Sequence, residues 1–128
     1  MFFKFHVYAI NPLYINEHLV EKAIKLKNIL ITGGSGYIGS ILTEILLIKG
    51  FNVTVLDLFE HSTSSLSFAS TCKSFDAYKV DVLDLEALTP FIANSDVIIP
   101  LAGLVGAPIC AQHKTLAELL NYKQVKDN

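Results

Sequence analysis

Apolar positions change their spacing repeatedly along the chain, and from Asn28 onward strand-like runs alternate with helix-like spacing. Residues 37–49 carry apolar side chains three and four positions apart, which predicts an amphipathic helix ended by Gly50. The apolar face of that helix includes Ile38, Ile41, Leu42, Ile45 and Leu46. Short, mostly apolar runs predict strands at residues 28–32, 52–57, 76–80 and 96–101.

The remaining segments connect these strands. Residues 58–74 are irregular and rich in Ser and Thr, and Asp84 caps a predicted helix that ends near residue 93. Residues 103–108 predict a loop, and residues 112–123 predict a further helix. Strands that alternate with helices form parallel sheets with right-handed crossovers. We therefore expect an α/β fold, a Rossmann-type parallel sheet with flanking helices and strand order 3-2-1-4, truncated after about four strands.

Residues 1–27 differ in pattern from the rest of the chain. Alternating apolar residues near the start predict a short strand, and Asn16 can cap a following helix. The chain thus divides into a leader of unassigned role, 1–27, and a partial α/β domain, 28–128. Because the fourth strand ends the sheet, its edge is open. We expect that edge either to be covered by the leader strand or to drive self-association.

Composition excludes several classes of protein. The chain has 128 residues, 52% of them apolar, which suits one packed domain. Its net charge of −2 gives no electrostatic reason to expect nucleic acid or an anionic membrane as a partner. All ten basic residues are lysines, so an arginine clamp on phosphate is absent.

Other sequence features predict a cytoplasmic location and no metal site. No apolar run approaches the roughly 20 residues of a membrane span. The first ten residues lack a clean apolar core and a cleavage site, so no signal peptide is expected. Cys72 and Cys110 fit reduced thiols better than a disulfide. The four histidines are scattered and match no metal-ligand spacing.

A glycine-rich turn, Gly33–Gly36, stands between the first predicted strand and the first predicted helix, as dinucleotide binding requires. Gly33 or Gly34 allows a sharp turn, and Gly36 lets the backbone approach a pyrophosphate. Gly39 lets the helix pack tightly on the strand. The first helical turn, which contains Tyr37 and Ile38, offers free N–H groups to the phosphates. The alternative is a tight strand-to-helix turn without a ligand.

Asp57 ends the second predicted strand, 18 positions after Gly39. An acid at about this spacing accepts hydrogen bonds from the hydroxyl groups of an adenosine ribose and repels a 2′-phosphate. With no arginine in the chain, this favours NAD over NADP, although Lys73 is a possible phosphate partner. The alternative is that Asp57 is a solvated acid at the end of a strand. Ser62, Ser64 and Ser65 fit either solvation of the following loop or contacts near the adenosine.

The sequence resembles the extended short-chain dehydrogenase/reductase family at residues 32–40, which read Thr-Gly-Gly-Ser-Gly-Tyr-Ile-Gly-Ser. The likeness is greatest to NAD-dependent nucleotide-sugar epimerases and dehydratases, the group of UDP-glucose 4-epimerase, and it covers residues 28–125. It implies that Asp57 binds the ribose and that Asp81 and Val82 flank the adenine. It also implies that further residues line the cofactor, namely Leu101, Ala102, Gly103 and, near the nicotinamide half, Asn121.

The sequence departs from this family at several points. Pro100 stands where the family often has His, and Gly103 stands where it has a second Ala. The family continues into a fifth strand, a catalytic Tyr-x-x-x-Lys pair and a substrate domain, which do not follow here. Tyr122 and Lys126 have that spacing, but they lie too early in the chain, so no catalytic residue is predicted.

Three functions remain open from the sequence. The first is the NAD-binding part of a nucleotide-sugar epimerase or dehydratase, inactive without the missing region. The second is a non-catalytic NAD-binding module that senses or scaffolds. The third is a non-functional gene fragment.

Overall fold

A computed structural model of the protein describes residues 28–60 and 64–123. The leader strand and helix expected within residues 1–27 lie outside these ranges, as does their expected contact with the sheet edge. No helix in the described part of the chain is long and apolar enough to cross a membrane.

The sheet has four parallel strands in the order β3-β2-β1-β4, which confirms the predicted topology. The strands are β1 (Asn28–Thr32), β2 (Asn52–Asp57), β3 (Phe75–Lys79) and β4 (Val97–Pro100). The α-helices are α2 (Tyr37–Ile48), α3 (Leu85–Ala93), α4 (Ala107–Gln112) and α5 (Lys114–Glu118). Three short turns complete the described elements: η1 (Ser64–Leu66), η2 (Ala69–Thr71) and the π-helical η3 (Leu119–Lys123).

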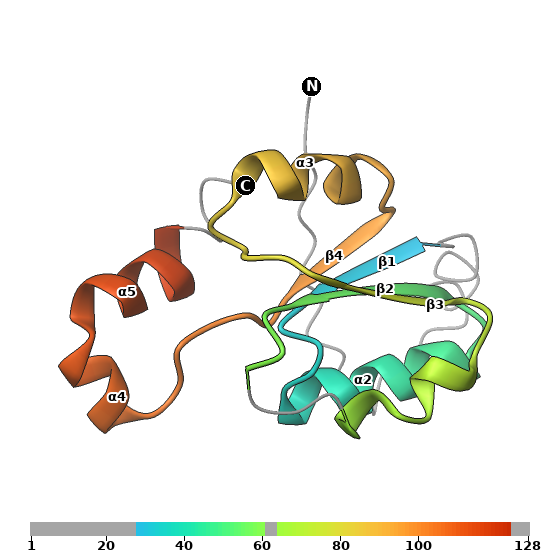
Figure 1. Cartoon of the computed structure of the whole chain (residues 1–128), viewed down its shortest axis with the longest axis horizontal. Coiled ribbons are helices and arrows are strands. Elements are labelled where there is room, and N and C mark those ends of the chain that lie inside the picture. The colour runs from blue at the N-terminus through green and yellow to red at the C-terminus, as the bar shows by residue number, and fades with distance from the viewer. Residues whose placement is uncertain (1–27, 61–63, 124–128) are drawn as a thin grey trace, which may run out of the picture.

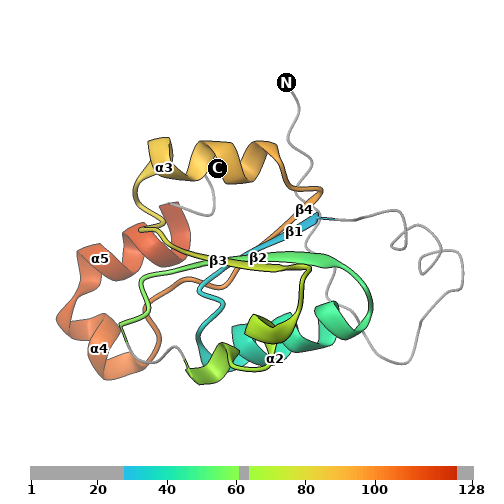
Figure 2. The ribbon, with the colours of Figure 1, turned by 45° about the vertical axis from the view of Figure 1, so that its right-hand side comes forward.

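The helices lie on both faces of the sheet (Figure 1). Helix α2 covers one face, with η1 and η2 packed beside it, and α3 covers the other. Helices α4 and α5 lie beyond the end of the sheet at which β1 and β4 finish, and Figure 2 shows the same arrangement from a second direction. The glycine-rich turn leaves β1 at this end, so the fold gathers the candidate site at the carboxyl ends of the strands.

The two central strands supply the core because successive strand residues point to opposite faces. The cluster on the α2 face contains Ile29, Ile31, Leu47, Val53, Val55, Leu66 and Ala69. The cluster on the α3 face contains Leu30, Leu56, Val82 and Leu88. Burial on both faces explains why these strands are almost continuously apolar.

Strand β4 is almost entirely apolar, as is typical of a strand covered on both faces, but each of its four residues is only half-buried. The reason is its position, since within the described residues β4 pairs with β1 alone. Asp96 donates its N–H to the Asn28 carbonyl, and backbone groups alternate in direction along a strand. The N–H groups of Val97 and Ile99 therefore point away from β1, along the open edge.

Pro100 does not interrupt the ladder between β1 and β4. Thr32 and Pro100 are register partners, and proline has no N–H to donate. The N–H of Leu101 takes its place and donates to the Thr32 carbonyl at 2.9 Å. The Thr32 carbonyl thus keeps a hydrogen-bond donor from the β4 chain, one residue later than the register predicts.

Two details of the predicted helices were wrong. The segment 103–108 was expected to be a loop, but α4 begins at Ala107, because Pro108 suits the first turn of a helix. The apolar face assigned to α2 was also too broad. Ile38, Ile41 and Ile45 are 66%, 48% and 44% exposed, whereas Leu42 and Leu46 pack against the core. Gly50 ends this helix region with φ +87°, as predicted.

Candidate functional site

Gly33 starts the glycine-rich turn with φ +70°, the left-handed conformation that glycine adopts without strain. Its N–H donates to the Leu56 carbonyl at 2.8 Å, which ties the turn to β2. A Cβ built on Gly33 would lie 2.5 Å from the backbone nitrogen of Ala102. The turn is therefore held between the ends of β2 and β4 with no room for a side chain.

The other glycines of the motif have different neighbours. A Cβ on Gly39 would lie 2.6 Å from both the Gly33 carbonyl oxygen and the Gly34 Cα. Gly39 thus lets α2 pack against the turn, rather than against the strand as predicted. A Cβ on Gly34 would meet the Val55 side chain at 2.6 Å, whereas one on Gly36 would approach only the Gly33 carbonyl oxygen, at 3.3 Å. The side of Gly36 is thus comparatively open, as close approach of a ligand to its backbone requires.

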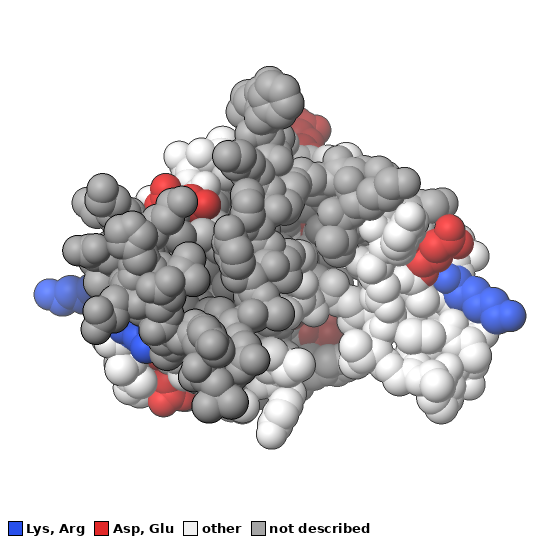
Figure 3. All heavy atoms as spheres, turned by 180° about the vertical axis from the view of Figure 1, so that it is seen from behind, with Lys and Arg blue, Asp and Glu red and all other residues white. Residues whose placement is uncertain are grey.

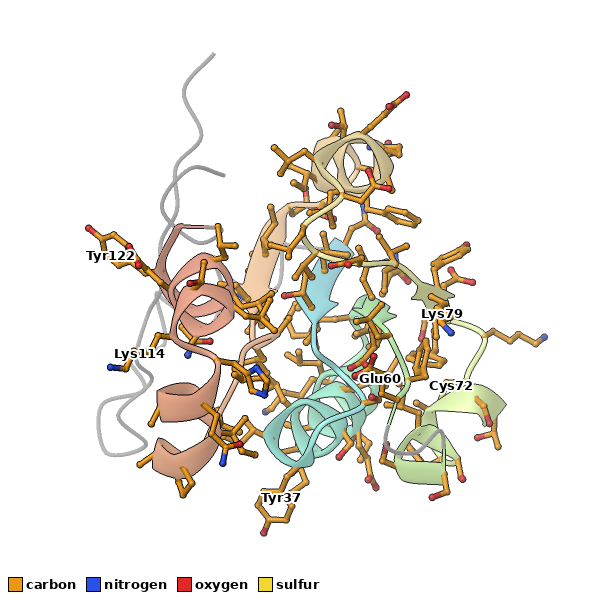
Figure 4. The ribbon with its side chains drawn as sticks, turned by 60° about the vertical axis from the view of Figure 1, so that its left-hand side comes forward. Tyr37, Glu60, Cys72, Lys79, Lys114 and Tyr122 are labelled. Atoms are coloured by element: carbon orange, nitrogen blue, oxygen red, sulfur yellow. The ribbon has the colours of Figure 1, made fainter. Side chains whose placement is uncertain are left out.

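Helix α2 begins at this turn without a side-chain cap from the described residues. The first N–H groups of a helix have no partner within the helix, and the helix dipole makes this end positive. The Tyr37 side chain is 85% exposed and points away from the sheet (Figure 4). Tyr37 and Ile38 therefore offer the site their backbone N–H groups, a combination suited to an anion such as a pyrophosphate.

Asp57 is half-buried at the end of β2, and both oxygens of its carboxylate accept backbone hydrogen bonds. Oδ2 accepts the Ser35 N–H and Oδ1 accepts the Phe59 N–H, each at 2.9 Å. Phe59 has φ +54°, which is uncommon for a side chain of this size. Asp57 therefore links the glycine-rich turn to the segment that follows β2 through two hydrogen bonds. Its spacing from Gly39 did not indicate this structural role.

Asn121 holds the segment that follows β4. Its Oδ1 accepts the Leu104 N–H and its Nδ2 donates to the Leu104 carbonyl, both at 2.8 Å. A Cβ on Gly103 would lie 2.7 Å from that same Oδ1. The glycine that departs from the family pattern thus makes room for the Asn121 amide, and the structure uses that amide to fix the loop.

The residues after β3 lie next to the end of β2, since these strands pair in register up to Asp57 and Lys79. The Asp81 carboxylate is exposed and accepts the Leu83 N–H at 2.9 Å. The Val82 side chain is only 6% exposed and belongs to the core. Of this pair, Asp81 presents its side chain to the surface and Val82 presents only its backbone.

Other groups in the described residues do not assemble a second site. Tyr122 is 59% exposed and points away from the sheet (Figure 4), and Lys126 lies outside the described ranges. Within those ranges no three His, Cys, Asp or Glu residues could hold a metal ion together. On the face in Figure 3, the Lys and acidic groups of the described residues are interspersed.

A range of the chain that includes the glycine-rich turn and Asp57 matches the sequence model of one protein family. Residues 29–119 match the sequence model described as "NAD dependent epimerase/dehydratase family". UDP-glucose 4-epimerase of Bacillus subtilis (strain 168) is 36% identical over 99 residues, which are 69% of this chain and 29% of that protein.

Solved structures share the fold. UDP-N-acetylglucosamine 4-epimerase from Methanobrevibacter ruminantium M1, in complex with UDP-N-acetylmuramic acid, superposes with a TM-score of 0.68 at 25% identity, covering 78% of this chain and 32% of that one. UDP-glucose 4-epimerase from Thermus thermophilus, in complex with NAD, gives 0.62 at 25% identity, covering 76% and 30%. The chain thus spans about three tenths of the length of these relatives.

Proposed function

Because the chain belongs to the NAD dependent epimerase/dehydratase family, we propose that its glycine-rich turn and the end of β2 bind NAD. The observation that carries this proposal is an uncapped helix N-terminus beside an acid, Asp57 at the end of β2, whose carboxylate accepts an N–H of the glycine-rich turn. The backbone of Gly33, Gly36 and the first turn of α2 suits the pyrophosphate, and Asp57 suits the adenosine ribose.

The remaining predicted contacts fit around this centre. Asp81 and Val82 would flank the adenine from the end of β3. Leu101, Ala102 and Gly103 would line the cofactor from the end of β4, beside Gly33. Asn121 would act on the nicotinamide half by holding the Leu104 backbone. We accordingly propose residues 28–128 as a partial NAD-binding domain, with residues 1–27 as a separate leader in a cytoplasmic protein.

The whole reaction of the family is a wider proposal, since the chain matches only part of its relatives. Bound NAD supplies a nicotinamide ring that accepts a hydride and returns it. In a complete relative the hydride would come from a nucleotide-sugar. In this chain the described residues would hold and orient the cofactor, and we assign none of them to proton transfer.

A thermal melt with and without NAD tests the cofactor proposal. At a ligand concentration about 100-fold above its dissociation constant, linkage predicts roughly 2.7 kcal/mol of stabilisation. For a domain of this size the midpoint should rise by about 10 °C. NADP should give a smaller rise, because the Asp57 carboxylate repels a 2′-phosphate. A cooperative melt that NAD leaves unchanged would refute NAD binding by this chain.

We also propose that the open edge of β4 mediates self-association. Among the described residues no strand pairs with the outward N–H groups of Val97 and Ile99, and exposed apolar edges associate readily. Val97→Pro removes one outward donor at the first residue of an edge strand, where proline is tolerated. In sedimentation velocity, the average mass of the wild-type chain should rise with concentration, and that of Val97→Pro should rise less. A wild-type mass that stays monomeric at every concentration would exclude the interaction.

A further inference from the structure

Ser65 reaches across the fold to the glycine-rich turn. Its hydroxyl donates to the Ser35 carbonyl oxygen at 2.8 Å, although 30 positions separate the two residues. The N–H of the same Ser35 donates to Asp57 Oδ2 at 2.9 Å. Ser35 is therefore held from two sides, by a hydroxyl on its carbonyl and by a carboxylate on its N–H.

We propose that Ser65 is a positioning residue for the ribose-binding carboxylate and the phosphate-binding turn. This inference rests on the proposed function, since it concerns the same NAD site. Ser65 would touch Ser35 and not the cofactor, and it would act by fixing the orientation of the Ser35 backbone against Asp57.

Peptide geometry explains why the carbonyl matters. The Ser35 carbonyl and the Gly36 N–H belong to one planar peptide and point in opposite directions. Ser65 holds the carbonyl, and the Gly36 N–H donates to the Gly33 carbonyl at 3.2 Å. If this peptide rotated, a carbonyl oxygen could turn toward the anion site and oppose phosphate binding. Anchoring both ends of the peptide prevents that rotation before the ligand arrives, which is preorganisation.

The local structure places Ser65 for this role. It lies in η1, which packs beside α2, and its neighbour Leu66 is only 6% exposed in the core. Other hydroxyls of the same segment bond within their own turns: Ser67 to the Ser64 carbonyl, Ser70 to that of Ser67 and Thr71 to that of Phe68. Ser65 thus donates to a residue 30 positions away, whereas these other hydroxyls donate to residues three positions away.

The test compares Ser65→Ala with Ser65→Thr and with the matched control Ser67→Ala. Because apparent affinity falls with the fraction of molecules whose turn has the binding-competent orientation, Ser65→Ala should weaken NAD binding roughly 3- to 10-fold by calorimetry. ADP-ribose, which lacks the nicotinamide, should lose the same factor. The Ser65 bond is exposed to solvent, so water replaces it and the melting temperature without ligand should change little. Ser65→Thr should restore the affinity, and Ser67→Ala should leave it unchanged.

Amide hydrogen exchange measures the same positioning without any ligand. In the unliganded chain, the Ser35 and Gly36 amides should exchange faster in Ser65→Ala than in wild type or Ser67→Ala. Unchanged affinity and unchanged exchange in Ser65→Ala would overturn the positioning role while leaving NAD binding intact. An equal loss of affinity in Ser67→Ala would also overturn it, since the cause would be general loosening of the segment. Failure of the wild-type chain to bind NAD would instead refute the proposed function, and the positioning role toward NAD with it.

Discussion

Replacing Gly33 with alanine should lower the melting temperature of the chain by more than 10 °C and abolish its response to NAD. Two effects add. A left-handed conformation costs a non-glycine residue about 1–2 kcal/mol. The new Cβ would also lie 2.5 Å from the Ala102 nitrogen and 2.6 Å from its Cα, and overpacking of this kind costs about 1–3 kcal/mol. Both neighbours are backbone atoms, so no flexible side chain can move aside. Each 1 kcal/mol lowers the midpoint of a domain this small by roughly 4–8 °C.

Gly50→Ala is the matched control for this variant. Gly50 also has a positive φ, +87°, but a Cβ there would meet no atom within 4 Å. It should show the conformational cost alone, about 1–2 kcal/mol, and keep the NAD response. Equal destabilisation by the two variants would mean that the contact between the glycine-rich turn and the end of β4 does not constrain the turn.

Replacing Asp57 with asparagine should remove the NAD-dependent rise in melting temperature and also destabilise the unliganded chain. The two side chains have nearly the same shape, but each carboxylate oxygen of Asp57 accepts a backbone N–H, from Ser35 and from Phe59. An asparagine side chain has one acceptor oxygen and one NH₂ group, so one of these donors would face another donor. Leaving a partly buried donor without an acceptor costs about 1–3 kcal/mol. Thermal melts with and without NAD measure both effects.

Asp84→Ala separates loss of stability from loss of binding. The Asp84 carboxylate also accepts a backbone N–H, that of Ala87 at 3.0 Å, where it caps α3 away from the glycine-rich turn. Removing the cap should cost about 1 kcal/mol and leave the NAD response in place. If Asp57→Asn kept the full NAD response, Asp57 would serve the turn only as a structural brace.

The strands and their order were predictable from the sequence because their signals are local. Short apolar runs, Gly50 and the Asp84 cap each act within a few residues, and the Rossmann pattern, with its glycine-rich turn after the first strand, then indicates the order 3-2-1-4. The exposure of Ile41 and Ile45 on α2 was not predictable. Helical spacing shows which residues share a face, but what packs against that face depends on the tertiary structure.

At the candidate site, the sequence indicated which residues gather but not what each one contacts. A glycine with positive φ could be predicted at Gly33 or Gly34, because only glycine adopts that conformation readily, and the structure assigns it to Gly33. The bonds from Asp57 to Ser35 and from Asn121 to Leu104 join residues 22 and 17 positions apart. No spacing rule predicts them, since both depend on how separate loops meet at the end of the sheet.

The two backbone bonds of Asp57 bear on any attempt to redesign the chain for NADP. One route to that preference would exchange the acid at the end of β2 for a neutral or basic residue, since the acid repels a 2′-phosphate. Here that exchange would also leave the Ser35 and Phe59 N–H groups without their acceptor, and so loosen the glycine-rich turn that the new cofactor must contact. A redesign would therefore keep Asp57 and introduce positive charge at a neighbouring position. The turn would then stay intact, and the preference for NADP over NAD would be only partial.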